Sequence, residues 1–327
     1  MDNITNPAAE QIKEHSLKWQ TLKSEIQKAI VGQDYVIDRV FIGLLCGGHI
    51  LLEGVPGLAK TTLIKTISQA IGLDFKRIQF TPDLLPADLL GTLVYNPKTQ
   101  EFQTRKGPIF TNLLLADEIN RAPAKVQSAL LEAMQERQIT IGDNTFYLED
   151  NFLVLATQNP IDQEGTYRLP EAQVDRFMFK LLMGYPTMQE EKEIVYKASN
   201  PQKITTVLDK EEINAAKSLV NQVYIDDKVI EYTLKLVFAS RTPQDFNLDD
   251  IHFFIQYGAS PRATLAINQA ARAHAFLRKR HFVIPDDVKA VAPDILRHRI
   301  LLTYEAEAEN ITTDQIIQQI LRTIPTP

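Results

Sequence analysis

The pattern of apolar and polar residues differs between the two halves of the chain. In the first half, uninterrupted apolar runs at 50–52, 113–116 and 152–156 are each followed by a polar or glycine-bearing turn. Runs without alternation are typical of strands that a parallel sheet buries on both faces. Together with apolar segments at 75–80 and 177–183, they predict five strands separated by helices, which is an α/β domain with a parallel sheet.

After Pro186 the apolar residues recur with helical spacing only, which indicates a separate all-helical domain. The expected helices lie at about 187–199, 209–224, 227–239, 261–279 and 285–298. A further helix is expected near the start, through Trp19 to Ala29. The predicted division is therefore an N-terminal tail (1–18), an α/β domain (19–185) and a helical domain (186–327).

Two segments interrupt the α/β pattern. Residues 81–110 are rich in proline and glycine, with short apolar fragments between them. A connection of this length inside a compact domain usually has a function or a structure of its own. We expect a short helix at about 84–89 and a hairpin that turns at Asn96-Pro97-Lys98. A second hairpin is expected at 138–148, around Gly142-Asp143-Asn144.

The composition narrows the class of protein. The formal net charge is −6, which disfavours a protein whose main task is to grip nucleic acid, although a local basic channel is compatible with an acidic average. The single cysteine, Cys46, excludes a disulfide within the chain and a cysteine-based zinc cluster, so the expected location is a reducing cytoplasm. Residues 1–10 do not resemble an export signal, and no apolar run approaches the roughly 20 residues of a membrane span.

The histidines carry no evident chemistry. They show no spacing typical of metal ligands, and we assign them no catalytic role; they are His15, His49, His252, His274, His281 and His298.

The stretch after the first apolar run has the character of a phosphate-binding loop. It reads Gly54-Val55-Pro56-Gly57-Leu58-Ala59-Lys60-Thr61-Thr62 and leads into a helical pattern. Backbone N–H groups at such a helix start can converge on phosphates. Lys60 would add a positive charge there, and the Thr61 hydroxyl would ligate Mg²⁺. Ala59 stands where the general pattern has its second glycine, and an ordinary strand-to-helix turn with a surface lysine remains an alternative.

Polar side chains follow two further predicted strands. Asp117 and Glu118 come directly after the run at 113–116, and Asn159 follows the run at 152–156. The carboxyl ends of strands are where open α/β sheets bind ligands. Phosphoryl transfer needs an acid near Mg²⁺ and a group that orients or deprotonates water, and we assign these roles to Asp117 and Glu118 respectively. Asn159 would hold the water, unless it forms only an Asn-Pro turn.

Three arginines are candidates for contacts with an anion. Arg176 precedes the last predicted strand and would either pair with a nearby acid or reach the nucleotide of a neighbouring subunit. Arg168 is a second candidate for that role. Arg262 lies in the first turn of a predicted helix, where the helix dipole disfavours a cation, and this suggests an anionic partner.

These motifs closely resemble those of the MoxR family of AAA+ ATPases, from about Ile30 to Arg299. The resemblance rests on Gly54-Val55-Pro56-Gly57-Leu58-Ala59-Lys60-Thr61, Leu115-Ala116-Asp117-Glu118-Ile119-Asn120-Arg121-Ala122-Pro123, Ala156-Thr157-Gln158-Asn159-Pro160, Glu171-Ala172-Gln173-Val174-Asp175-Arg176-Phe177 and Gly258-Ala259-Ser260-Pro261-Arg262-Ala263. Ala59 before the lysine is typical of this family.

The resemblance implies a role for each motif. Lys60 and Thr61 would be the Walker A pair, Asp117 and Glu118 the Walker B pair, Asn159 sensor 1, Arg176 the arginine finger and Arg262 sensor 2. Val31, Gly32 and Gln33 would lie against the adenine of ATP. The 81–110 and 138–148 segments would be the helix-2 insert and the pre-sensor-1 hairpin, and 186–327 would be the lid. Family members are thought to act as ring-shaped, chaperone-like machines, here a homo-oligomer expected to be a hexamer, on partners that often carry von Willebrand factor A domains.

Two other classes of function remain open. A nucleic-acid translocase is one, because related ring ATPases include helicases and because Arg272, Arg278, Lys279, Arg280 and His281 fall along one segment. Those residues gather at a helix C-terminus, where cations are favoured in any case. A nucleotide-binding scaffold without hydrolysis is the other, and the presence of Glu118 disfavours it.

Overall fold

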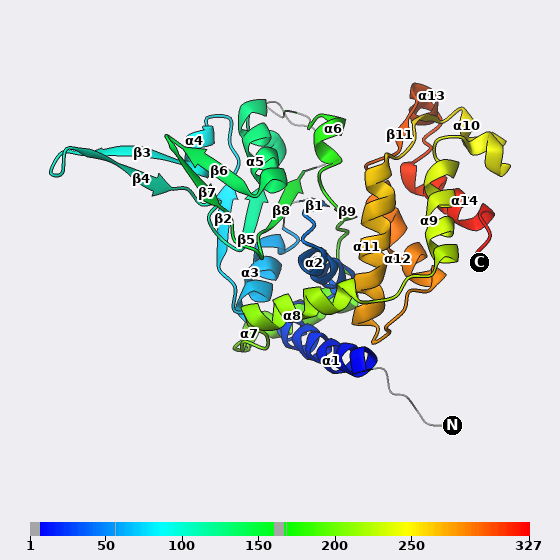
Figure 1. Ribbon diagram of the computed structural model, residues 1–327, viewed down its shortest axis with the longest axis horizontal. Helices are drawn as coiled ribbons and strands as arrows, with labels where there is room; N and C mark the ends of the chain where they lie inside the picture. The colour runs from blue at the N-terminus through cyan, green and yellow to red at the C-terminus, as the bar shows by residue number, and fades with distance from the viewer. Residues whose placement is uncertain (1–6, 56, 160–166, 168) are drawn as a thin grey trace. The chain divides into compact units, whose positions relative to one another are not determined.

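The computed structural model describes residues 7–55, 57–159, 167 and 169–327 and divides into two compact units. The sheet unit comprises residues 21–177 and 181–210, and the helical unit comprises the remainder: the residues up to 20, 178–180 and 211–327. Each unit is described by itself, with the element labels of Figure 1.

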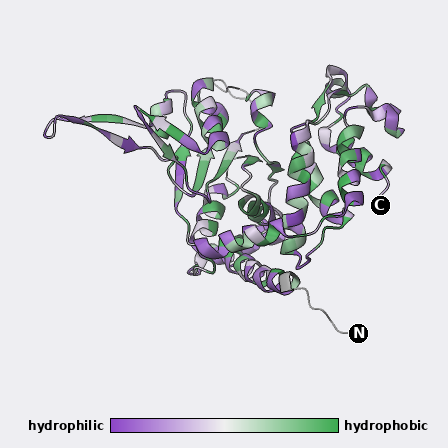
Figure 2. Cartoon of the chain, in the orientation of Figure 1, coloured by the Kyte–Doolittle hydropathy of each residue, from purple (hydrophilic) through white to green (hydrophobic). Residues whose placement is uncertain are grey.

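The sheet unit is built on a five-stranded sheet in the order β2-β5-β8-β1-β9. Its strands are β1 (Ile50–Glu53), β2 (Phe75–Gln79), β5 (Leu113–Asp117), β8 (Leu153–Gln158) and β9 (Phe179–Leu182, assigned to this unit from Leu181). β1 pairs with β8, β8 with β5, and β5 with β2, all in parallel. The apolar runs in β5 and β8 are buried, and they colour green in the middle of the sheet in Figure 2. The predicted α/β fold with a parallel sheet is confirmed.

Helices precede, connect and follow the strands, as the helical pattern predicts. They are α2 (Asp34–Cys46), α3 (Lys60–Ala70), α5 (Ala124–Glu136), the short α6 (Glu171–Val174) and α7 (Met188–Ser199). The apolar spacing of α5 determines which of its faces packs against the core, because Val126, Leu130 and Met134 share one face and are all buried.

Both predicted interruptions are present. The first contains α4 (Pro86–Leu90) and an antiparallel hairpin of β3 (Gly91–Asn96) and β4 (Glu101–Lys106), and the second is a hairpin of β6 (Gln138–Ile141) and β7 (Asn144–Tyr147). The ammonium group of Lys106 lies 4.8 Å from the ring centre of Phe110 and 4.9 Å from that of Phe146. This cation–π contact links β4 to β7, and each such contact contributes about 0.5–1 kcal/mol at an exposed position.

The helical unit contains more elements than the sequence predicted. Expected helices are present as α8 (Lys210–Asn221, assigned to this unit from Glu211), α9 (Asp227–Ala239), α11 (Pro261–Leu277) and α12 (Pro285–Leu296). The prediction of helices alone is wrong, because β10 (Ile255–Tyr257) and β11 (Leu301–Leu302) form a small antiparallel sheet. Strands of three and two residues are too short to leave a periodic pattern. The short η2 (Pro243–Phe246), α10 (Asp249–His252) and α13 (Tyr304–Ala308) were missed for the same reason.

α14 (Thr313–Thr323) was also missed, although the sequence carries a signal for it. Thr312 and Gln315 form a capping box: the hydroxyl of Thr312 accepts from the N–H of Gln315, and the side-chain oxygen of Gln315 accepts from the N–H of Thr312. A threonine followed three residues later by glutamine is a recognised helix start.

The predicted limits of the units differ from those observed. α1 spans Pro7–Gln27, so a helix occupies most of the predicted N-terminal tail (1–18). Residues 187–210 group with the sheet unit instead of the helical one. Hydrogen bonds explain that grouping, because the Val207 N–H donates to the Ala70 carbonyl (2.7 Å) and the Lys197 ammonium donates to the Gln27 carbonyl.

A membrane span requires a helix that is both long and apolar. None of the helices within the described part of the chain combines the length and the apolar character needed to cross a bilayer.

Candidate functional site

The loop between β1 and α3 is held tightly against the sheet. The Gly54 N–H donates to the Gln158 carbonyl at 3.3 Å, and the Met183 N–H donates to the Glu53 carbonyl at 2.8 Å. A Cβ atom on Gly54 would lie 2.8 Å from the Met183 carbonyl oxygen, so only glycine fits there. Ala59 adopts a left-handed conformation with φ of 55°, which glycine would adopt with less strain. Pro56 lies outside the described residues.

Lys60 begins α3, and its side chain folds back over the loop. Its Nζ donates to the Gly54 carbonyl at 2.5 Å. Burial lowers the pKa of Lys60, while the nearby charges of Asp117, Glu118 and Glu53 act in the opposite direction. Desolvation strengthens the interaction of the ammonium with any anion that enters the loop.

Asp117 ends β5 and is engaged through both of its oxygens. Its Oδ1 accepts from the Thr157 hydroxyl at 2.6 Å. Its Oδ2 accepts from Arg77, from Nη2 at 2.6 Å and from Nε at 3.1 Å. The parallel register of β2, β5 and β8 brings these residues together, because all three strands end at the same edge.

Glu118 follows in a left-handed conformation with φ of 55°, which turns its side chain away from the strand direction. Its backbone N–H donates to the Thr157 hydroxyl oxygen at 2.8 Å. Its Oε2 accepts from Gln79 Nε2 at 3.0 Å and from Arg121 Nη1 at 2.9 Å. Thr157 therefore joins the two acids, donating to one and accepting from the backbone of the other.

The segment that follows Asp117 and Glu118 is held in place by the buried side-chain amide of Gln127. Gln127 is fully buried on α5, and its Nε2 lies within hydrogen-bond distance of the carbonyl oxygens of Ile119 (3.2 Å), Ala122 (3.1 Å) and Tyr167 (3.1 Å). These contacts hold the short 3₁₀ turn η1 (Ile119–Arg121) that carries Arg121.

A cavity of about 420 Å³ lies over these groups. Its lining combines the loop and helix start with the ends of β2, β5 and β8: Gly54, Gly57, Leu58, Ala59, Lys60, Thr61, Thr62, Arg77, Gln79, Asp117, Glu118, Thr157 and Asn159. The loop, both acids and Asn159 are therefore brought together as the sequence predicted. Val55 belongs to the same loop without lining the cavity.

The donors in this cavity fit Mg²⁺. The Thr61 hydroxyl and the Asp117 carboxylate are hard oxygen ligands on the same cavity wall. Within the described ranges, no group of three or more His, Cys, Asp or Glu side chains forms a ready-made metal cage. That pattern is the one expected of Mg²⁺, which takes one or two protein ligands and completes its shell with phosphates and water.

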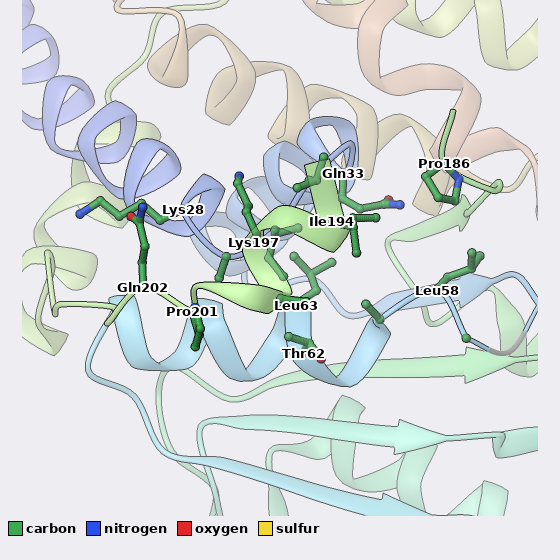
Figure 3. A pocket seen from close by; sticks show the side chains of 16 residues that line it. Lys28, Gln33, Leu58, Thr62, Leu63, Pro186, Ile194, Lys197, Pro201 and Gln202 are labelled. Carbon is green, nitrogen blue, oxygen red and sulfur yellow. The ribbon is translucent and has the colours of Figure 1, made fainter. Parts of the chain in front are cut away.

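A second cavity of about 430 Å³ adjoins the first, and the two share Gly57, Leu58, Ala59 and Thr62. Its walls are mostly apolar and come from α3, α7 and the segment before α2; Figure 3 shows Leu63 and Ile194 among the side chains gathered there. Val31 and Gln33 also line it. Gly32 lies between them with φ of 71°, and a Cβ atom there would meet Glu190 Oε1 at 2.5 Å.

The predicted arginines that the structure describes, Arg176 and Arg262, do not line either cavity. Arg176 follows α6 in the sheet unit, half-buried, and lines neither cavity; its guanidinium forms no hydrogen bond or ion pair within the part of the chain that is described. Arg262 is exposed in the first turn of α11, in the other unit. Arg168 lies outside the described residues. The roles suggested for these three arginines stay predictions.

No role was predicted from the sequence for four residues that shape the site: Arg77, Gln79, Arg121 and Thr157. β2 reads Phe-Lys-Arg-Ile-Gln, and this polar content on an otherwise buried sheet was a signal that could have found Arg77 and Gln79. Thr157 stands at the end of an apolar run, and only the pairing of β8 with β5 places it between the two acids.

Comparisons with known proteins find relatives over most of the chain. Residues 49–179 match the family model described as "ATPase family associated with various cellular activities (AAA)", and residues 249–320 match the "AAA lid domain" model. The chain is 48% identical over 304 residues to "Chaperone MoxR1" of Mycobacterium tuberculosis, covering 93% of this chain and 81% of the relative. It is 45% identical to "Uncharacterized protein YeaC" of Bacillus subtilis, covering 92% of each. A crystal structure from Cytophaga hutchinsonii superposes with a TM-score of 0.93 at 50% identity, covering 98% of both chains.

Proposed function

This chain belongs to the MoxR family of AAA+ ATPases, and we propose that it hydrolyses ATP with Mg²⁺ at the subunit interfaces of a homo-oligomeric ring and uses the turnover to remodel partner proteins. The family membership makes the chain an ATPase. The metal, the ring, its expected hexameric form and the partners are our inference.

The two adjoining cavities support a position for ATP. The polar one, with Lys60 and the loop, suits the phosphates, because backbone N–H groups at the start of α3 and a desolvated ammonium both favour anions. The apolar one suits the adenine ring, with Val31 and Gln33 on its wall. Gly57 to Ala59 border both cavities, so one molecule can span them.

The chemistry follows from the groups that surround the phosphates. Mg²⁺, held by Thr61 and Asp117, would neutralise charge that develops on the phosphate oxygens. Glu118 would orient and deprotonate the attacking water, and Asn159 would hold that water in place. Lys60 would stabilise the negative charge of the β- and γ-phosphates. The observation that carries this proposal is that one cavity wall brings together Lys60, Asp117, Glu118 and Asn159 from separate segments of the chain.

The ring completes the site from a second subunit. A guanidinium supplied in trans is worth about 10³–10⁵ in rate where nucleotide hydrolases have been measured. The guanidinium of Arg176 has no hydrogen bond or ion pair among the described residues, which suits this role; Arg168 is the second candidate. Arg262 would act from the lid. The expected partner is a protein, one with a von Willebrand factor A domain by analogy with the family.

The alternative of a nucleic-acid translocase loses part of its support. Arg280 was one of the basic residues in its favour, and both of its terminal nitrogens are bound to the buried Asp287, at 2.6 and 2.5 Å. The Arg280 guanidinium is thus paired with Asp287 in α12 instead of facing a ligand. A shift assay at two salt concentrations tests the alternative, because phosphate contacts weaken steeply with salt.

Glu118→Gln tests hydrolysis. We expect turnover to fall by about 10²–10⁴, the contribution of a general base, while ATP binding is retained. The matched control is Glu132→Gln, which removes the same charge from an exposed position on α5. Turnover is measured by phosphate release and binding by calorimetry. Wild-type turnover in Glu118→Gln would remove Glu118 from the mechanism, and an inactive wild-type ring that still binds ATP would favour the scaffold.

Mixing subunits tests the ring. Arg176→Ala alone should be inactive, since no subunit presents the guanidinium. Mixing it with Glu118→Gln should restore activity at those interfaces where an intact Glu118 meets an intact Arg176. Rings that form but show no rescue would contradict the trans role of Arg176.

A further inference from the structure

Arg77 is bonded to the carboxylate of Asp117, the group that would have to be available to bind the metal ion. It projects from β2 and gives two hydrogen bonds to Oδ2 of Asp117, at 2.6 and 3.1 Å, while Oδ1 accepts from Thr157 at 2.6 Å. A carboxylate offers about four lone-pair positions, so three are engaged by these contacts. The guanidinium of Arg77 therefore already binds Asp117, the carboxylate that is proposed to bind the cation.

The position of Arg77 is itself fixed. Its Nη2 also donates to Oε1 of Gln79 at 2.7 Å, and the Gln79 amide is anchored in turn on Glu118 at 3.0 Å. A guanidinium held at two points is aimed at Asp117 before any ligand arrives. The side chain is nevertheless 46% exposed, so it can move to solvent without a large loss of packing.

We propose that Arg77 is a positioning residue that competes with the divalent cation for Asp117. This inference rests on the proposed function, because it takes Asp117 as the metal ligand. The competition weakens the hold of Asp117 on a free cation and favours a cation that arrives with nucleotide phosphates. Removing Arg77 should therefore tighten metal binding, the reverse of what the loss of a supporting residue does.

The test measures metal affinity directly. Mn²⁺ replaces Mg²⁺ as a spectroscopic probe and is titrated into the complex of the whole chain with ADP, with free Mn²⁺ followed by electron paramagnetic resonance. In Arg77→Met we expect the dissociation constant for Mn²⁺ to fall about threefold to tenfold, because the charge that is removed is hydrogen-bonded to the proposed ligand Asp117 itself, in a partly screened site. Arg77→Lys keeps the charge and should stay close to wild type.

Arg121→Met is the matched control. Arg121 is 44% exposed and pairs with Glu118 instead of Asp117, so its loss removes the same charge from the neighbouring acid. Its Mn²⁺ affinity should stay within about twofold of wild type, because Glu118 is not the proposed ligand. Thermal unfolding of each variant verifies that it is folded.

The outcomes separate this inference from the proposed function. An unchanged Mn²⁺ affinity in Arg77→Met, or an equal tightening in Arg121→Met, overturns the role of Arg77. A loss of ADP binding in Arg77→Met without metal also overturns it, since Arg77 would then bind phosphate. A wild-type complex with no affinity for Mn²⁺ contradicts the proposed function itself.

Discussion

The two ends of the central sheet both carry polar side chains, and they use them in different ways. At the amino end, the buried His49 accepts the Val154 N–H at its Nδ1 (3.0 Å), and its Nε2 lies 3.2 Å from the Met134 carbonyl oxygen. Nearby, Arg137 donates to the carbonyl oxygens of Phe152 and Gly47, both at 2.7 Å. Here the partners are backbone groups.

At the carboxyl end the acidic side chains bind mainly other side chains. Asp117 is engaged by Arg77 and Thr157, and Glu118 by Gln79 and Arg121. Side chains can rearrange when a ligand enters, whereas a backbone partner inside a sheet cannot move without disturbing the sheet. The comparison teaches that His49 and Arg137, which bind backbone groups, support the fold, and that the two acids, which bind side chains beside a cavity, are available for chemistry. Lys60 lies beside the cavity but donates to the backbone carbonyl of Gly54, so its class has to be tested.

Lys60→Ala gives the largest expected effect and tests the carboxyl end. Loss of a desolvated charge opposite an anion costs about 2–5 kcal/mol, which is about 30-fold to several thousandfold in affinity. We expect ADP binding, measured by calorimetry, to weaken within this range. Lys65→Ala, on the exposed face of the same helix, should bind as wild type does. If Lys60→Ala retains its affinity and loses only thermal stability, Lys60 belongs with the residues that support the fold.

The contrast between the two ends also explains what the sequence could predict. The loop, Asp117, Glu118 and Asn159 lie directly after strands, and parallel strands end at one edge, so their meeting could be foreseen. The polar content of β2 marks Arg77, but its pairing with Asp117 could not be foreseen, because that pairing depends on which strand becomes the neighbour of β5. The order of strands is set by long-range packing, which a local pattern does not encode.

The lid and the histidines show the same limit. The long helices were predicted from their periodicity, and the β10–β11 pair was not, because two short strands leave no pattern. His49 was assigned no catalytic role on spacing alone, and that assignment remains a prediction. Its burial between two backbone groups was not foreseeable, since it depends on Met134 and Val154, which are distant in sequence.

The amino end of the sheet should make the stability of the protein depend on pH, through His49. Burial, with a smaller contribution from the Arg137 charge, lowers the pKa of His49 from 6.5 to about 3. The neutral ring must accept at Nδ1, because Val154 is a donor. Below about pH 6.5 the unfolded chain therefore binds a proton on this histidine, whereas the folded chain does not bind it until about pH 3. The free energy of unfolding keeps its full contribution from His49 above pH 6.5 and decreases as the pH falls from 6.5 towards 3. Between pH 7 and pH 5 this one group should cost about 2 kcal/mol.

His49→Gln removes that titration. The variant is expected to be less stable than wild type at pH 7, but its stability should fall less between pH 7 and pH 5, by about 2 kcal/mol. Urea unfolding at the two pH values measures this difference, and His281→Gln, at an exposed position, should follow wild type. An identical pH dependence in wild type and His49→Gln would show that His49 is not held neutral by the fold.

Thr157 gives the smallest expected effect and is the sharpest test of the comparison, because it belongs to both classes. Its buried hydroxyl accepts from the Glu118 backbone and donates to the Asp117 side chain. We expect Thr157→Val to lose about 1 kcal/mol in unfolding free energy and about threefold to tenfold in ATP turnover, with Thr157→Ser close to wild type in both. A loss of stability with unchanged turnover would place Thr157 with His49, since the hydroxyl would then support the backbone alone. A loss of turnover that Thr157→Ser restores would show that the geometry of the two acids, and not only the fold beneath them, depends on this bridge.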